Sequence, residues 1–198
     1  MEELTRLIRE DMRPALGVTE PGAIAFAVSK ARTYVKGAVT GVELRLNSGM
    51  YKNAYTCGIP NNSFMGNEYA AALGLLAGKP EMGLECLAEV TEADNAAAEE
   101  LVAAGKIKVS MSGISSRIFI EAKVTSENGE AVVTIRGSHT NIVRIQVNGE
   151  TVFSGSEESG EEESAPPLIH SYTLEQMVSY ADTVPAAEIS FISEAYEM

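Results

Sequence analysis

The hydrophobic pattern of this sequence changes near residue 106, and that change limits the folds open to the chain. Before it, apolar residues recur mostly at helical spacing, as in 2–12. Beyond it they alternate in short runs, and two links between runs carry Asn-Gly, at 128–129 and 148–149. Asn-Gly is a strong signal for a tight hairpin. We therefore predict an α+β fold, with helices packed on one face of a largely antiparallel sheet and a meander of about four or five strands in residues 106–155.

Helices are expected on both sides of this meander, with ends set by capping and stop signals. The second begins just after Thr19, a plausible N-cap, and carries Pro21 in its first turn, where no helical N–H bond is lost. Gly105 is expected to end the fourth helix, and Thr173 to cap the fifth. The predicted helices cover residues 2–12, 20–36, 67–78, 83–104, 173–181 and 185–196.

Two segments between the helices have a different character. Residues 40–46 alternate apolar and polar side chains, which predicts a half-buried strand. Residues 47–66 have no clean period and are rich in Gly, Asn and Ser, which predicts a functional or packed loop. The acidic stretch 156–164 is expected to be a solvated loop, because calcium loops need a different spacing of acidic residues.

Length and apolar content predict one globular domain over residues 1–198. The chain has 198 residues, of which 45% are apolar, enough for a real core. The sequence stops at Met198, inside a periodic segment without a Gly stop, so we expect the chain to be part of a longer protein.

Charge and segment lengths exclude several classes of partner. Asp and Glu total 28 against 15 Lys and Arg, a net charge of −13, which argues against nucleic acid and anionic membranes. The N-terminus lacks the apolar core of a signal peptide. No apolar run approaches the roughly 20 residues that span a bilayer. We expect a cytoplasmic protein.

The segment 13–21 (RPALGVTEP) is the first candidate site. Pro14 and Gly17 form a turn that brings Thr19 and Glu20 to a helix start. Simple capping explains this pattern, and so does binding of a substrate carboxylate by the free N–H groups of the first turn.

The second candidate lies between two predicted strands, where His139 stands among Ser138, Thr140 and Asn141. Four consecutive polar residues are unusual where a two-residue link would suffice. Histidine is suited to proton transfer near neutral pH, but a lone histidine is also often structural. Both interpretations stay open.

Lys52 and Asn53 form a third, weaker candidate, since Lys52 could neutralise a substrate carboxylate and Asn53 could supply directional hydrogen bonds. The sequence also gives no set of residues expected to bind a metal. Cys57 and Cys86 are two thiols, whereas an iron–sulfur cluster needs about three or four ligands.

Together these segments resemble the cysteine desulfidase family, which is related to iron–sulfur L-serine dehydratases. The resemblance runs over essentially the whole chain in order and spacing. Its anchors are residues 14–21 (PALGVTEP), 52–53 (KN), 70–74 (AAALG), 83–85 (GLE), 103–106 (AAGK) and 139–143 (HTNIV).

The resemblance implies a domain of a larger enzyme. Family members are about twice this length, and a C-terminal domain absent from this chain holds a [4Fe-4S] cluster. The implied reaction is α,β-elimination from L-cysteine or L-serine to pyruvate and ammonia. This chain would be the N-terminal domain and would be inactive alone. Its expected partners are the small amino-acid substrate and the cluster-bearing domain. Whether it also forms a homodimer is left open. The implied substrate-binding residues are Thr19, Glu20, Lys52, Asn53, Thr140 and Asn141, with His139 for proton transfer.

One residue departs from the family pattern. The family usually has Cys where this chain has Val18, and valine can neither ligate iron nor transfer a proton. Two other readings therefore stay open. The chain could be a stand-alone module that senses a small amino or hydroxy acid, or an unrelated structural domain in which Glu20, Lys52 and His139 share no cleft.

Overall fold

A computed structural model describes residues 2–12, 15–115, 117–156 and 168–196. The chain divides into two compact units. Unit 1 comprises Met1–Pro14 and Ser159–Met198, and unit 2 comprises Ala15–Glu158. No helix in the described ranges has the length and apolar character needed to cross a membrane.

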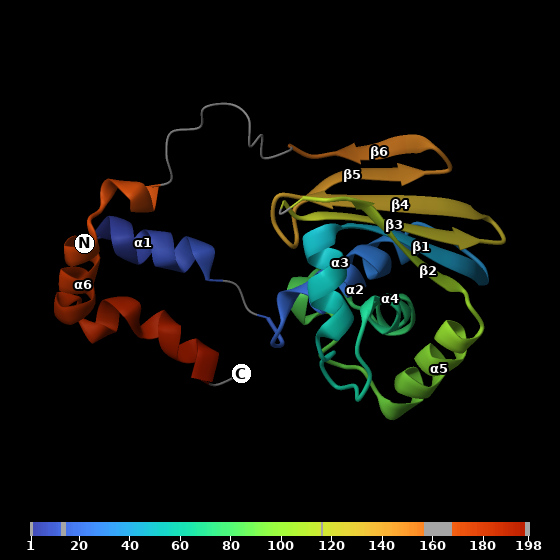
Figure 1. The fold of residues 1–198 in the computed structure, drawn as a ribbon, viewed down its shortest axis with the longest axis horizontal. Helices are drawn as coiled ribbons and strands as arrows, with labels where there is room; N and C mark the ends of the chain where they lie inside the picture. The colour runs from blue at the N-terminus through green and yellow to red at the C-terminus, as the bar shows by residue number, and fades with distance from the viewer. Residues whose placement is uncertain (1, 13–14, 116, 157–167, 197–198) are drawn as a thin grey trace. The chain divides into compact units, whose positions relative to one another are not determined.

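Unit 2 is a six-stranded sheet with its helices on one face (Figure 1), which confirms the predicted α+β class. The strand order is β2-β1-β3-β4-β5-β6. The strands are β1 (Val39–Asn47), β2 (Ile107–Gly113), β3 (Phe119–Ser126), β4 (Gly129–Arg136), β5 (Ile142–Val147) and β6 (Glu150–Ser154). The helices are α2 (Thr19–Arg32), α3 (Ser48–Thr56), α4 (Asn67–Leu76), the 3-10 turn η1 (Pro80–Glu85) and α5 (Glu92–Ala103).

The core lies between the sheet and α2. Leu44, Ala122, Val133 and Ile145 are register partners across four adjacent strands, and all are buried on the helix-facing side. On the opposite face, Arg45 and Arg144 both pair with the carboxylate of Glu121. This division between an apolar and a charged face follows from the two-residue period of each strand.

Helix α2 is buried on all sides, and its small residues allow this. A Cβ placed on Gly74 of α4 would lie 2.5 Å from the carbonyl oxygen of Ala25. A Cβ on Gly22 would lie 2.9 Å from the carbonyl oxygen of Leu84. The backbones therefore approach closely, and α2 packs between the sheet, α4 and η1.

The predicted meander is correct for β3 to β6 and wrong for β2. Strand β2 pairs parallel with β1, which lies between it and β3. Alternation predicts that a segment is a strand but not which neighbour it joins. A parallel neighbour needs a long crossover, and here the segment from α3 to α5 supplies it.

The predicted loop 47–66 contains a helix, α3. Asn47 is its N-cap residue, and Met50 and Ala54 are buried one turn apart. Tyr51 and Tyr55 stack with ring centroids 6.4 Å apart. The segment was predicted to be a loop because its glycine and asparagine residues have low helix propensity. In so short a helix, the two buried residues give too weak a periodic signal to offset them.

The single helix predicted for 83–104 is also wrong. The chain forms η1, turns at Gly83 with a φ of 57°, and starts α5 at Glu92. A capping box between Thr91 and Asp94 marks this new start. Of the acidic stretch 156–164, residues 157–164 lie outside the described residues.

Unit 1 joins segments from the two ends of the sequence. It contains α1 (Glu2–Asp11), η2 (Leu168–Ser171), α6 (Leu174–Thr183) and η3 (Ala186–Tyr196). The hydroxyls of Thr5 and Tyr180 lie 2.8 Å apart. Thr173 caps α6, as predicted, in a capping box with Gln176. The helix predicted for 185–196 is a 3-10 helix instead.

Candidate functional site

The clearest candidate site in unit 2 begins where α2 meets the turn between β4 and β5. Thr19 is the first residue of α2, and His139 lies in that turn. The Oγ1 atom of Thr19 and the Nε2 atom of His139 are 3.3 Å apart, although 120 residues separate them in sequence. The contact joins two of the three segments that the sequence singles out.

A second contact adds α3, the third segment. The Nδ2 of Asn53 donates a hydrogen bond of 2.9 Å to Oε1 of Glu20. The hydroxyl of Thr19 lies 3.5 Å from the other carboxylate oxygen of Glu20. Thr19, Glu20, Asn53 and His139 thus form one connected group, which we call the Thr19 cluster.

The chain reaches the cluster through two turns. Gly17, with a φ of +91°, redirects the backbone ahead of α2. Val18 is the N-cap residue, so Thr19 is not the cap that we predicted. The turn that carries His139 closes when the backbone N–H of Arg136 donates to the carbonyl of Asn141, at 3.1 Å. Because Thr19 lies inside the helix and does not cap it, its hydroxyl is available to contact His139 and Glu20.

Two buried asparagines hold α3 in place, and sequence reasoning missed both. Asn47 donates to the carbonyl of Ser115 at 2.8 Å and accepts from the N–H of Phe119 at 3.0 Å. Asn67 donates to the carbonyl of Tyr51 at 3.1 Å. The available signal was the position of Asn47, directly after an alternating strand, where an N-cap is common.

Burial and hydrogen bonding set the titration of the cluster. Burial lowers the pKa of His139 below its ordinary value of 6.5, and the Glu20 carboxylate opposes this shift. Burial also tends to raise the pKa of Glu20. The bonds from Asn53, from its own backbone N–H and from Thr19, with the charge of His139, outweigh burial and lower that pKa overall. At neutral pH the cluster therefore pairs a neutral imidazole with a carboxylate.

This pairing gives the site two chemical capacities. A neutral imidazole can accept a proton, and an ionised carboxylate can bind an ammonium group. Glu20 and His139 are only partly buried, and Asn53 is exposed, so a small molecule can reach them.

The remaining predicted residues lie near the cluster in sequence without joining it. Lys52 precedes Asn53 on α3, is exposed, and forms no ion pair within the described part of the chain. Thr140 is exposed beside His139. The amide of Asn141 donates to the carbonyls of Arg136 and Ser156, at 3.1 and 3.5 Å, and so supports the turn. Val18 is 44% exposed.

The thiol of Cys86 does not suit an iron–sulfur cluster. Burial raises the pKa of Cys86 to about 12, and its Sγ lies 3.6 Å from the carbonyl oxygen of Gly22. A ligand thiol must be deprotonated, and this environment favours the protonated form. Across the described residues, no three His, Cys, Asp or Glu side chains gather in a metal-binding group.

Comparison with known proteins finds relatives without a stated activity. No family model matches the chain. A UPF0597 protein of Clostridium botulinum (strain Langeland) is 30% identical over 201 residues, covering 98% of this chain and 47% of the relative. A UPF0597 protein of Caldanaerobacter subterraneus is 35% identical over 197 residues, covering 98% and 46%. The UPF0597 protein YhaM of Salmonella dublin is 37% identical over 191 residues, covering 95% and 44%. The chain therefore spans about half the length of the curated relatives it matches.

Proposed function

We propose that unit 2 binds the substrate of an iron–sulfur-dependent amino-acid lyase, which converts L-cysteine or L-serine to pyruvate and ammonia by α,β-elimination. The observation that carries the proposal is the 3.3 Å contact between Thr19 and His139, extended by the bond between Asn53 and Glu20. Three segments distant in sequence bring a base, a carboxylate and an amide together at an accessible place. Simple capping of α2 would require none of these partners.

The proposed roles follow from charge and protonation. The Glu20 carboxylate pairs with the substrate ammonium, and Lys52 with the substrate carboxylate. Asn53 orients Glu20, while Thr140 and Asn141 border the substrate. Neutral His139 takes the proton from Cα. The electron pair of that C–H bond forms the Cα–Cβ double bond as thiolate or hydroxide leaves Cβ. The 2-aminoacrylate released then reacts with water to give pyruvate and ammonia.

The described residues supply the base but no electrophile for the leaving group. We therefore assign the [4Fe-4S] cluster and the rest of the reaction to a further domain of a longer protein. The half-length match to the curated relatives supports this assignment. We also place the protein in the cytoplasm, where sulfhydryl groups stay reduced. The 198-residue chain by itself is expected to release no pyruvate from L-cysteine or L-serine.

Ligand binding by the 198-residue chain tests the proposal. L-serine titrated into labelled chain should shift the NMR signals of His139 and Asn53 in a saturable way. Glu20→Gln should weaken this binding about tenfold, because the carboxylate charge that pairs with the substrate ammonium group is lost. Glu81→Gln, a change of an exposed carboxylate in η1, should leave it unchanged. Saturable binding that is equal in all three proteins, or no binding, would refute the proposal.

A second function uses the same cluster without catalysis: a stand-alone module that senses a small amino or hydroxy acid. It also predicts L-serine binding, so the reading frame beyond Met198 must separate the two. A continuation with three or four spaced cysteines supports the lyase, and a stop codon supports the module. Pyruvate release by the 198-residue chain alone would contradict both.

A further inference from the structure

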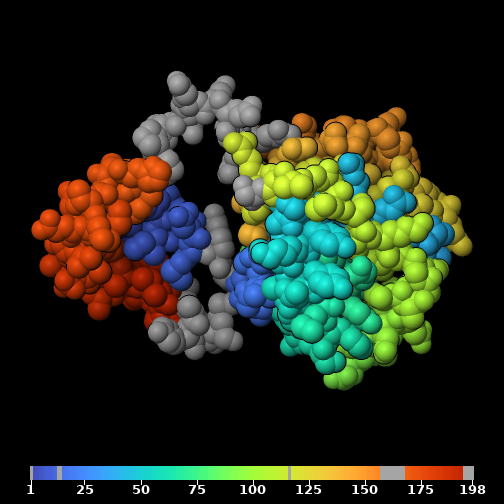
Figure 2. Space-filling view, viewed as in Figure 1, coloured from blue at the N-terminus to red at the C-terminus, as the bar shows by residue number. Residues whose placement is uncertain are grey.

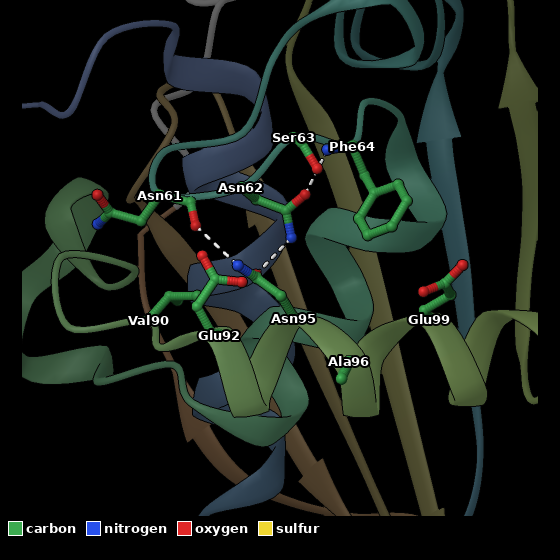
Figure 3. A pocket seen from close by; sticks show the side chains of 9 residues that line it. All are labelled: Asn61, Asn62, Ser63, Phe64, Val90, Glu92, Asn95, Ala96 and Glu99. Carbon is green, nitrogen blue, oxygen red and sulfur yellow. Dashed lines mark hydrogen bonds between the residues drawn. The ribbon is translucent and has the colours of Figure 1, made fainter.

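Unit 2 has a hollow that shares no residue with the Thr19 cluster. It lies between the loop 61–64 and α5, and has a volume of about 650 Å³. The loop and α5 face each other across it (Figure 3), and both lie on the surface of unit 2 (Figure 2). None of its nine lining residues is basic.

Asparagine side chains build one wall of this hollow. The Nδ2 of Asn62 donates to Oδ1 of Asn95 at 2.6 Å, and the Nδ2 of Asn95 donates to the carbonyl of Asn61 at 3.0 Å. These bonds fix the loop against α5 and fix both amides in orientation. Each amide has two N–H donors and two acceptor lone pairs, so each keeps capacity for a ligand.

Two carboxylates on α5 belong to the same hollow. Glu92 opens α5 and Glu99 lies seven residues later, which separates them by roughly 10 Å along one helix face. In Figure 3 both side chains rise from α5 toward the loop, on either side of Asn95 and Ala96. The surface is thus negative at two separated points.

Phe64 supplies an apolar surface between these charges. Its ring stacks on Tyr69 with centroids 4.4 Å apart, which holds it rigid. Figure 3 shows the ring extending from the loop toward α5. The face of a phenyl ring attracts cations. It can also pack against the methylene groups of a ligand.

We propose that this hollow binds an elongated organic dication, of the di- or polyamine class. Two ammonium groups of the ligand pair with Glu92 and Glu99, and its methylene chain lies against Phe64. The amide oxygens of Asn62 and Asn95 accept hydrogen bonds from the remaining ammonium N–H groups. A neutral polyol would use the amides and leave both carboxylates unmatched. A short monovalent amine would reach one carboxylate only.

NMR titration with spermidine tests this proposal. The side-chain amide signals of Asn62 and Asn95 should shift and saturate, and butylamine should bind more weakly. Glu99→Gln should raise the dissociation constant about two- to fivefold, the range for an exposed charge pair, and the double variant with Glu92→Gln should raise it further. Thermal unfolding confirms that each variant is folded.

The matched control is Glu100→Gln. Glu100 is exposed, adjoins Glu99 on α5, and does not line the hollow, so the variant changes net charge equally. Spermidine affinity should stay as in the parent chain. Equal weakening in Glu99→Gln and Glu100→Gln means nonspecific attraction to an acidic protein and overturns the proposal. So do absence of saturation and preference for a neutral polyol such as glucose.

Discussion

The hydroxyl of Thr19 lies 3.3 Å from the imidazole Nε2 of His139, across 120 residues of sequence. The contact links the first turn of α2, the most buried helix, to a turn at the end of the antiparallel strands. Thr19 contacts both His139 and Glu20, so the protonation of His139 should respond to that nearby carboxylate.

Replacing Glu20 with Gln should lower the pKa of His139 further. Burial already holds that pKa below 6.5, and the Glu20 charge is what opposes burial. An NMR titration of the His139 ring protons measures the shift. Glu81→Gln serves as a control and should leave the titration unchanged. An increase in the pKa of His139 in Glu20→Gln would contradict the arrangement.

The same shift gives a pH dependence of stability. Below a pH of 6.5, the ordinary pKa of histidine, His139 binds a proton in the unfolded chain. In the folded chain its lowered pKa keeps it neutral to a lower pH. The contribution of His139 to folding is thus complete above that pH and is lost as pH falls toward the folded pKa. Urea unfolding across this window should show a shallower pH dependence in His139→Gln than in the parent chain.

Removing the amide of Asn53 should raise the pKa of Glu20. Its bond to the Glu20 carboxylate, 2.9 Å long, is the largest of the effects that favour the ionised form. In Asn53→Ala this bond is absent, so burial, which favours the neutral form, raises the pKa of Glu20. Carboxyl carbon shifts in an NMR titration report the change. Thr56→Ala, on the same helix, should leave the titration of Glu20 unchanged.

The sequence predicts the strands and most helices here because each depends on nearby residues. Two Asn-Gly links give the β3–β4 and β5–β6 turns, and Thr173 gives the start of α6. Strand β2 is misplaced because its parallel pairing with β1 joins residues that are 65 positions apart, such as Val42 and Ile107. Spacing alone proposes each segment of the Thr19 cluster but not their contacts, which the packing of α2 against the sheet creates.

Gly74→Ala should destabilise unit 2 by about 3 kcal/mol, at the upper end for an overpacked core. The added Cβ would lie 2.5 Å from the Ala25 carbonyl oxygen and 2.6 Å from its Cα, and backbone atoms cannot move aside cheaply. Urea unfolding measures the loss. Gly113→Ala, where a Cβ has open space, should change the free energy of unfolding by less than about 0.5 kcal/mol.

Thr134→Val should stabilise unit 2 by about 1 kcal/mol. Thr134 is 2% exposed, and its hydroxyl has no hydrogen-bond partner among the described residues. Valine keeps the shape and removes the desolvated oxygen. Urea unfolding should therefore show a higher midpoint with an unchanged slope. Thr151→Val, a change on the exposed strand β6, is the control. A lower midpoint for Thr134→Val would mean that the Thr134 hydroxyl forms a hydrogen bond in the folded chain.

A thiol reagent should modify Cys57 in the folded chain and spare Cys86. Cys86 is 1% exposed, and burial raises its pKa to about 12, so at pH near 8 its reactive thiolate is scarce. Cys57 is partly exposed. One thiol per chain should react before unfolding and two after it, and Cys57→Ser should leave none reactive in the folded state. Rapid labelling of Cys86 in folded Cys57→Ser would show that the α2–η1 contact opens. It would also show that a metal could reach Cys86, which its burial argues against.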